Sequence, residues 1–579
     1  MPPPAAPPSL FDQFARGWRA YVLIGLLALV SGLMGAARVP VTDIDEARFA
    51  QATRQMIETG DYVRIRIQDM ERNRKPVGIH WLQAASVNAM QPFTDRLNTI
   101  WPYRLPSVLG LVLASLATLW AGTILLGARA SFIGAALFAV GLLAGIEGML
   151  AKTDAVMTGF TALALAALAQ LRVGTRRPRL IALIFWSAIA CGILVKGPVT
   201  PVVVGLTLLT LALWERRAAW MQPLAFWLGP AVAALIVTPW LIAIGAATEG
   251  RFFSELLLRE IGPKIVGGHH AHGGMPGYYL LLLPVLIFPA TYALPAALRI
   301  GWGALRAGAN NEAQAPYRFL IAWAAPAFAF FELMPAKLVH YTLPTYPAIA
   351  LLCGAGLMLA RARWRTTHPA GVVVFLVAGA VIVGLMATAS AFMPGGLADA
   401  GLRRAVATAL IGVLTLSAAT AVLLLVRHPA ARAAALVGCA LIFSFSLRER
   451  LLPEARGLWA SSEAAAVMAR TRIQPSDDGN FWVVGYEQPS IVFLTKTSIR
   501  LASADDAARE AGAGDGMIVE GRVLSDTEAA LEAHGLRFEA AEPPARAMAI
   551  GRGEPMALYV GRVRDNVSGE AADVPPRTP

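Results

Sequence analysis

The sequence predicts a polytopic α-helical membrane protein that ends in a small α/β domain. Of the 579 residues, 56% are hydrophobic and only 15% are charged, whereas soluble globular chains carry about 25% charged residues. Apolar runs of roughly 18 residues or more, long enough to cross a bilayer, recur along most of the chain. After about residue 449 these runs stop, and short β-like and helical patterns alternate.

The apolar runs predict about thirteen transmembrane helices. A proline-rich stretch, residues 1–19, precedes them and is expected to be disordered. The first run is too long for the hydrophobic region of a signal peptide, so we interpret it as an uncleaved span. The expected spans are residues 20–39, 104–127, 131–149, 154–171, 180–195, 199–214, 222–246, 277–298, 318–334, 338–360, 370–393, 402–426 and 433–447.

Arginine and lysine indicate how these spans are oriented. Basic clusters lie in alternate connections, at residues 172–179, 215–217, 361–365 and 427–432, and such clusters favour the cytoplasmic side. The N-terminus is then cytoplasmic, and an odd number of spans places the C-terminus in the periplasm of a bacterial inner membrane protein. The net charge of +12 therefore reflects cytoplasmic loops, and no nucleic-acid partner is expected.

The long loop at residues 40–103 is expected to be a folded element on the outer membrane surface. Residues 45–59 have the spacing of an amphipathic helix, "VRIRIQ" alternates as a strand does, and "KPVGIHWLQAASVNAM" predicts a second amphipathic helix. At the other end of the chain, residues 450–565 predict a periplasmic α/β domain, with β-like runs at 481–486, 490–494 and 556–563. Residues 566–579 are expected to be a flexible tail.

Carboxylates at the edges of spans gather on the same outer side. In "DIDEARF", Asp45 and Glu46 are the first residues of a predicted helix. Acidic side chains at a helix N-terminus interact favourably with the helix dipole, so these two residues could either cap the helix or take part in catalysis. Asp43 fits a solvated loop. Asp154 opens an apolar span; it fits a helix cap, and an ionisable residue in that position is also a functional candidate.

Cations and histidines occupy the same side. Four lysines on this side have two possible roles: they either extend from span ends to the membrane interface or serve as fixed cations that bind a phosphate. They are Lys75, Lys196, Lys264 and Lys337. Lys75 and Lys264 lie in the two long loops, which favours the phosphate role. The loop "GGHHAHGG" contains His272, for which metal binding and simple loop polarity are both open.

Six segments together resemble a known family: "DIDEARFAQATRQMIETGDYV", "RKPVGIHWLQ", "AKTDAVMTG", "VKGPV", "HGGMPGYYLLLLPV" and "KLVHYTLPTYPAIALL". Their order and spacing resemble the GT-C membrane glycosyltransferases of the ArnT and protein O-mannosyltransferase superfamily, above all the aminoarabinose-transferase type that modifies lipid A. The resemblance covers about residues 20–450.

The resemblance implies a GT-C catalytic domain over residues 20–449 and inverting sugar transfer from a polyprenyl-phosphate donor to lipid A or another envelope glycolipid. It implies that Asp45 and Asp154 are the catalytic carboxylates and that Arg48 orients Asp45. Contacts to the donor phosphate are implied for Lys75, Lys264 and Tyr341. Further candidates for substrate binding are Glu46, His272, Lys337 and His340.

Two departures from the family pattern affect these expectations. Arg74 stands directly before Lys75, where aminoarabinose transferases carry an acidic residue associated with a metal. Because an arginine repels a cation, neither a metal nor another cofactor is expected, and the identity of the sugar stays open. Lys264 stands where the family has an arginine, and lysine lacks the bidentate fork.

Two other functions stay open. A protein O-mannosyltransferase-like enzyme would take a peptide acceptor. A lipid or lipid-linked-sugar flippase is the alternative of another class, although such proteins place charges near the bilayer midplane and often contain repeats, which are not found here. We expect a monomer that contacts membrane lipids.

Overall fold

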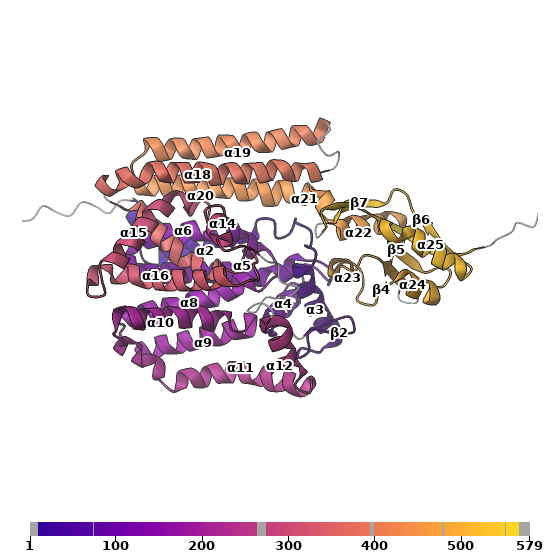
Figure 1. The fold of residues 1–579 in the computed structure, drawn as a ribbon, viewed down its shortest axis with the longest axis horizontal. Coiled ribbons are helices and arrows are strands. Elements are labelled where there is room, and N and C mark those ends of the chain that lie inside the picture. The colour runs from indigo at the N-terminus through magenta and orange to yellow at the C-terminus, as the bar shows by residue number, and fades with distance from the viewer. Residues whose placement is uncertain are drawn as a thin grey trace, which may run out of the picture.

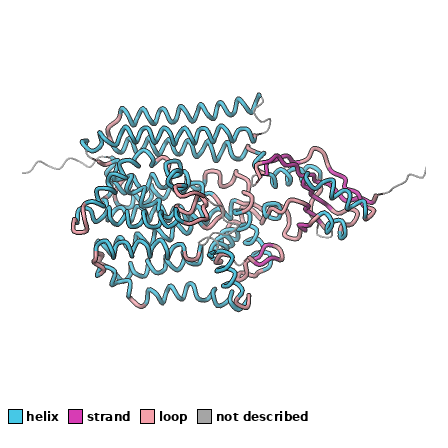
Figure 2. The backbone as a smooth tube through the Cα atoms, in the orientation of Figure 1, coloured by secondary structure: helices cyan, strands magenta, loops and turns pink. Residues whose placement is uncertain are grey.

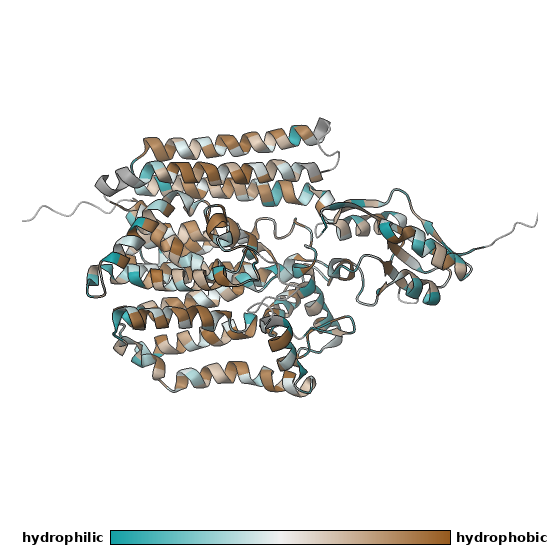
Figure 3. Cartoon of the chain, in the orientation of Figure 1, coloured by the Kyte–Doolittle hydropathy of each residue, from teal (hydrophilic) through white to brown (hydrophobic). Residues whose placement is uncertain are grey.

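The computed structural model describes residues 10–72, 74–262, 274–359, 361–393, 399–476, 480–549 and 552–566. Figure 1 shows a block of long helices with a smaller α/β domain at one end of it. In Figure 2 the strands are confined to a short hairpin and to this C-terminal domain. In Figure 3 the long helices are mostly hydrophobic, whereas the C-terminal domain contains both hydrophobic and hydrophilic residues, as the change in composition near residue 449 predicts.

Seven helices in the described part of the chain are apolar and long enough to cross a membrane, and two bent pairs raise the number to nine. The pairs are α6 (Ala128–Ala139) with α7 (Leu142–Met149), and α14 (Tyr278–Leu286) with η3 (Ala290–Ala293) and α15 (Leu294–Arg306). The seven are α5 (Trp101–Leu126), α8 (Asp154–Val173), α9 (Pro178–Lys196), α11 (Leu228–Ala247), α18 (Arg361–Ala389), α19 (Asp399–Leu425) and α20 (Pro429–Phe445), which continues through η7 (Ser446–Leu451) and α21 (Leu452–Glu454).

The predicted number of thirteen spans is not confirmed by these helices. Three further apolar helices, α2 (Gly17–Leu33), α10 (Val199–Glu215) and α17 (Tyr346–Leu357), contain 17, 17 and 12 residues. A straight helix needs about 20 residues to cross the hydrocarbon core, so length alone does not qualify them. The structure supports a helical fold with several spans, and α16 (Ala315–Leu333) packs against α10 and α17 within it.

Close approach of small residues joins the central helices. α5 packs along α8, and Gly110 lies at their contact. A Cβ atom added at Gly110 would lie 2.6 Å from the backbone nitrogen of Val156, so only glycine permits this distance between the two backbones. Short helical segments complete this part of the chain: α1 (Leu10–Phe14), η1 (Ala219–Ala225), α12 (Arg251–Glu255), η2 (Leu256–Ile261), η4 (Glu312–Gln314), η5 (Leu343–Thr345) and η6 (Ser390–Phe392).

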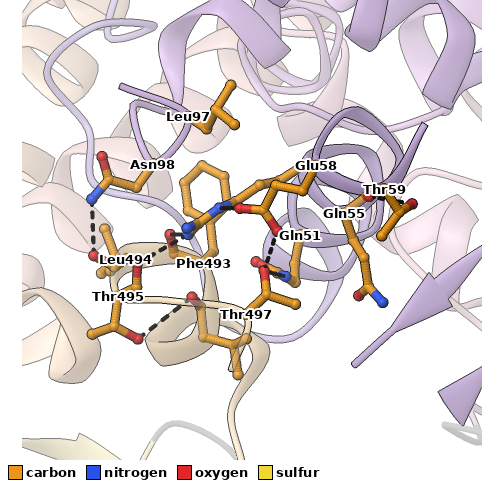
Figure 4. Close-up of polar contacts among 12 residues, drawn as sticks. Gln51, Gln55, Glu58, Thr59, Leu97, Asn98, Phe493, Leu494, Thr495 and Thr497 are labelled. Atoms are coloured by element: carbon orange, nitrogen blue, oxygen red, sulfur yellow. Dashed lines mark hydrogen bonds and ion pairs between the residues drawn. The ribbon is translucent and has the colours of Figure 1, made fainter. Parts of the chain in front are cut away.

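The first long loop contains two helices, α3 (Asp45–Thr59) and α4 (Gly78–Ala89), with a hairpin of β1 (Arg66–Ile67) and β2 (Met70–Glu71) between them. That α3 lies on the membrane surface stays a prediction, but α3 does not expose a polar face as an amphipathic surface helix does. Its polar residues are mostly buried, because α3 packs between α4 and α23 (Pro489–Leu494) of the C-terminal domain. Figure 4 shows this contact: Gln51 donates to Thr497 at 2.8 Å, and Thr497 donates to Glu58 at 2.7 Å.

The C-terminal domain is one mixed sheet with helices packed on it. Strands β3 (Phe481–Val484), β4 (Arg500–Ala502) and β5 (Gly516–Glu520) are parallel, and β8 (Glu554–Asp565) pairs antiparallel with β5. Both β6 (Leu536–Ala540) and β7 (Ala545–Ala549) also pair antiparallel with β8. The helical segments of this region are η8 (Arg456–Leu458), α22 (Ala460–Thr471), α23, α24 (Ala504–Glu510), η9 (Gly521–Val523) and α25 (Leu524–Ala533).

One β-like run of this domain is a helix. The run "SIVFL" at residues 490–494 was predicted to be β-like but forms most of α23. Pro489 at the first helical turn favours a helix start, and the run is too short and apolar for periodicity to separate helix from strand. The free carbonyl groups at the end of α23 accept hydrogen bonds from the first loop, from Arg54 to Phe493 at 2.8 Å and from Asn98 to Leu494 at 3.0 Å. α23 therefore attaches the domain to α3.

Candidate active site

Five ionisable side chains from distant segments meet in one buried cluster, which we call the charge cluster. They are Glu147 of α7, Lys152, Asp154 of α8, Lys196 at the end of α9, and His340. Lys152 Nζ lies 3.2 Å from Glu147 Oε2, and Lys196 forms an ion pair with Asp154. His340 joins the two carboxylates, since Nδ1 lies 3.6 Å from Glu147 Oε1 and Nε2 lies 3.6 Å from Asp154 Oδ1.

Asp45, on α3, acts electrostatically on this cluster through Lys152. It is the first residue of the helix, and the preceding Ile44 has a left-handed backbone with φ of 71°, which turns the chain sharply into α3. Although burial alone lowers the pKa of Lys152, the carboxylates of Glu147, Asp154 and Asp45 together raise it above its ordinary value. The charges of Asp45 and Asp154 thus act on one lysine, which places the two predicted catalytic carboxylates around the same site.

Lys75 and Tyr341, the predicted phosphate-binding residues, also lie here. Lys75 Nζ is 4.8 Å from the ring centroid of Phe49, which stands four residues after Asp45 and therefore on the same face of α3. Lys75 also acts electrostatically on His340. The Tyr341 ring centroid lies 5.5 Å from Lys196 Nζ. Lys264, the third predicted phosphate-binding residue, and His272, a predicted substrate-binding residue, lie outside the described residues.

Glu46 is an anchor in the fold, and its role in substrate binding stays a prediction. Its carboxylate accepts two hydrogen bonds from Arg104, both at 2.8 Å, and one each from the backbone N–H groups of Thr42 and Ala151. Glu46 and Arg104 are fully buried. These contacts occupy both carboxylate oxygens, so Glu46 ties the start of α3 to α5.

Lys337 is likewise held by its surroundings, and its role in substrate binding also stays a prediction. Its ammonium group donates to the carbonyl groups of Glu332 and Met334 and lies 3.4 Å from a Glu332 carboxylate oxygen. Glu332 in turn accepts hydrogen bonds from the backbone N–H groups of Gly277 and Tyr279 at the start of α14. Lys337 is buried and neutralises an acidic helix cap.

Two other acidic-loop residues differ in their contacts. No hydrogen bond or ion pair joins Arg48 to Asp45 within the described residues, so the orienting role of Arg48 stays a prediction. Asp43 is not the solvated loop residue that was expected. It accepts hydrogen bonds from Ser490 and Tyr486 of the C-terminal domain, and burial raises its pKa despite these bonds.

Glu147, Lys152 and Lys196 are cluster residues that the sequence analysis did not select as site residues. Glu147 is the only acidic residue in the apolar run at residues 131–149, and a lone ionisable residue in such a run signals function. Lys152 lies two residues before Asp154, and the sequence around Lys196 fits a span-end lysine as well as a cation that binds a phosphate. These lysines differ from ordinary span-end lysines because they pair with carboxylates, and those pairs are recognised only in the folded structure.

The charge cluster is better suited to bind an anionic ligand through its lysine ammonium groups than to bind a metal ion. Donor atoms of Glu147, Asp154 and His340 lie within 4.8 Å of one another, close enough for one divalent ion. However, both carboxylates are already paired with Lys152 and Lys196, and a cation there would be repelled by two ammonium groups. The residues do not fit a metal in this arrangement, and metal independence stays a prediction. Together with Lys75, the lysines suit an anionic group that leaves during reaction.

Known proteins resemble parts of this chain in sequence. A model of the dolichyl-phosphate-mannose-protein mannosyltransferase family matches residues 74–242. The undecaprenyl phosphate-alpha-4-amino-4-deoxy-L-arabinose arabinosyl transferase of Pseudomonas aeruginosa (strain UCBPP-PA14) is 33% identical over 321 residues, 54% of this chain and 55% of that protein. That of Pectobacterium atrosepticum is 29% identical over 320 residues, 54% of each chain. The chain spans about half the length of the curated relatives it matches.

Solved structures resemble nearly the whole chain. The crystal structure of ArnT from Cupriavidus metallidurans bound to undecaprenyl phosphate matches with a TM-score of 0.74 and 20% identity, over 95% of this chain and 98% of that one. The archaeal oligosaccharyltransferase AglB from Archaeoglobus fulgidus matches with a TM-score of 0.51 and 11% identity, over 94% and 74% of the two chains. The predicted resemblance is confirmed, and the fold is that of ArnT.

Proposed function

We propose that this ArnT-like chain is an inverting glycosyltransferase that moves a sugar from a polyprenyl-phosphate donor to lipid A or another envelope glycolipid. The observation that carries the proposal is the convergence of Asp45 and Asp154 on Lys152, beside Lys75 and Tyr341. The named activity of the arabinosyl transferases and the undecaprenyl phosphate in the ArnT crystal structure support this donor class.

Asp45 acts as the general base in this proposal. It is only half-buried at the start of α3, so an acceptor can reach it, whereas Asp154 is buried and ion-paired. The acceptor oxygen attacks the anomeric carbon, Asp45 takes the proton of an acceptor hydroxyl, and the bond to the carrier phosphate breaks with its electron pair on the phosphate oxygen. A phosphate acceptor is already anionic and needs positioning more than a base.

The cations stabilise the departing polyprenyl phosphate. Lys75 and Lys196 supply positive charge near the leaving oxygen, and the Tyr341 hydroxyl supplies a hydrogen-bond donor. Asp154 keeps Lys196 in place. Lys152 keeps the three carboxylates around it from repelling one another, so it is a positioning residue for Asp45 and Asp154.

The finer organisation belongs to the same proposal. We assign residues 1–19 to the cytoplasm, residues 20–449 to a catalytic domain with thirteen spans, residues 450–565 to a periplasmic domain and residues 566–579 to a tail. The protein is a monomer of the bacterial inner membrane, with its active site on the periplasmic side. Arg48 and Lys264 keep the roles that the resemblance implies, and His272 and His340 stay candidates for substrate binding.

Sugar transfer by the purified full-length protein tests the proposal. Undecaprenyl-phosphate-linked sugars and lipid A are incubated with the protein, and the lipid is analysed by mass spectrometry. Asp45→Asn should lower transfer by about 100-fold or more while the protein stays folded. The matched control is Asp69→Asn, which changes an exposed aspartate in the hairpin turn of the same loop. Full transfer by Asp45→Asn refutes the assignment of the base, and mannosylation of a peptide in place of lipid A favours the O-mannosyltransferase alternative.

A further inference from the structure

A groove lies between the membrane helices and the C-terminal domain. Its volume is about 680 Å³. One wall consists of Phe392 and Met393, which directly follow membrane helix α18, and the other comes from α22 and β7. An apolar wall that continues from a membrane span suits the part of a lipid that emerges from the bilayer.

Positive charge is concentrated on the domain side of this groove. Its charged lining residues are Arg456, Glu463, Arg470 and Arg546. Arg456 lies 3.8 Å from Glu463, which neutralises it in part. The side chains of Arg470 and Arg546 are exposed, and neither side chain forms a hydrogen bond or ion pair with another residue that the structure describes. Two unpaired guanidinium groups in one groove match a phosphate, which they can bind through bidentate hydrogen bonds.

The groove adjoins a second cavity beside the start of α3. Met548 of β7 borders both, and the second cavity has a volume of about 230 Å³. Asp43, Ile44 and Tyr486 line this second cavity, and the residue after Ile44 is Asp45. Of its other charged groups, Arg552 donates to Glu520 at 2.5 Å, and Glu487 is exposed with no hydrogen bond or ion pair to a residue that the structure describes. The cavity is polar without an unpaired arginine, which suits uncharged sugar hydroxyl groups.

We infer that the groove and the second cavity form the acceptor site for a phosphorylated glycolipid. Arg470 and Arg546 bind a phosphate group of its headgroup, its acyl chains follow Phe392 and Met393 into the membrane, and its sugar part extends toward Asp45. This inference rests on the proposed function and adds to it the role of the C-terminal domain. A peptide acceptor would use neither the apolar wall beside α18 nor the unpaired arginines.

Lipid binding by the full-length protein in nanodiscs tests the inference without the donor. The probes are diphosphorylated lipid A, the same lipid without phosphates, and phosphatidylglycerol as competitor. The double variant R470Q/R546Q should bind diphosphorylated lipid A about tenfold or more weakly, and the dephosphorylated lipid unchanged. The matched control is R537Q, which changes an exposed arginine on β6 of the same domain that has no partner among the described residues.

Two results overturn the inference: unchanged lipid A binding by the double variant, or displacement of lipid A by an equal concentration of phosphatidylglycerol, which indicates a general contact with anionic lipids. Transfer assays separate this inference from the proposed function. Wild-type protein that transfers no sugar but binds lipid A through both arginines refutes only the proposed function. Transfer by R470Q/R546Q with an unchanged KM for lipid A refutes only the acceptor site.

Discussion

Replacing Glu46 by glutamine should destabilise the protein, whereas replacing the adjacent Asp45 by asparagine should remove the transferase activity. The Glu46 carboxylate accepts four hydrogen bonds, two of them from the Arg104 guanidinium, and both side chains are fully buried. Arg104 also donates to the backbone carbonyl groups of Ala36, Val39 and Pro40. The variant leaves the Arg104 charge buried with no carboxylate to balance it.

The cost follows from this arrangement. Breaking a buried ion pair by removing one partner typically costs about 3–5 kcal/mol, because the remaining charge stays desolvated. That is a large part of the total free energy of unfolding of a typical domain, about 5–15 kcal/mol. We therefore expect Glu46→Gln to lower the apparent melting temperature strongly. A glutamine side chain keeps one acceptor oxygen, so the loss should be smaller than that of Glu46→Ala.

Thermal unfolding of the detergent-solubilised protein measures the effect, at one fixed heating rate because such unfolding is often irreversible. The matched control is Glu539→Gln, since Glu539 pairs with Arg564 at 2.9 Å but both side chains are more than half exposed. An exposed pair contributes about 0–1 kcal/mol, so this control should stay close to wild type. A Glu46→Gln protein with an unchanged melting temperature but no transfer refutes the reasoning and returns Glu46 to the substrate site.

Four further outcomes follow from the structure. Burial alone raises the pKa of Glu46, but Arg104 and the backbone hydrogen bonds lower it below its ordinary value in the folded protein. The stability that the Glu46–Arg104 pair contributes should therefore be lost as the pH falls below about 4.3, the ordinary glutamate pKa. Melting temperatures measured across a range of pH check this. Lys152→Met should reduce transfer by about 100-fold through repulsion between the carboxylates, and normal kcat would exclude its positioning role. Gly110→Ala should cost about 1–3 kcal/mol in the denaturation assay, since its Cβ meets the α8 backbone, whereas Gly205→Ala, with nothing within 4 Å, should be neutral. A chelator should leave transfer unchanged, and inhibition that a divalent ion reverses would show a metal requirement.

Much of the architecture follows from composition and local pattern. The long apolar runs predict the membrane helices because a bilayer requires continuous apolar segments whose backbone groups bond internally. The helical spacing of residues 45–59 predicts α3 with its observed bounds. In contrast, the β-like prediction for residues 490–494 is wrong, because so short an apolar run fits helix and strand equally by periodicity, and the run forms a helix that packs against α3.

For the candidate site, the sequence by itself determined which ionisable residues stand at the edges of apolar spans, and the family resemblance singled out Asp45 and Asp154. Only the tertiary structure decided how neighbouring residues divide their roles. Asp45 and Glu46 look equivalent in the sequence, but Arg104, 58 residues away from Glu46, takes one of them as a buried partner. Glu147 and His340 meet across the fold in the same way. An ion pair between distant segments depends on burial and on atomic distances of a few ångströms, and these exist only after the helices have packed together.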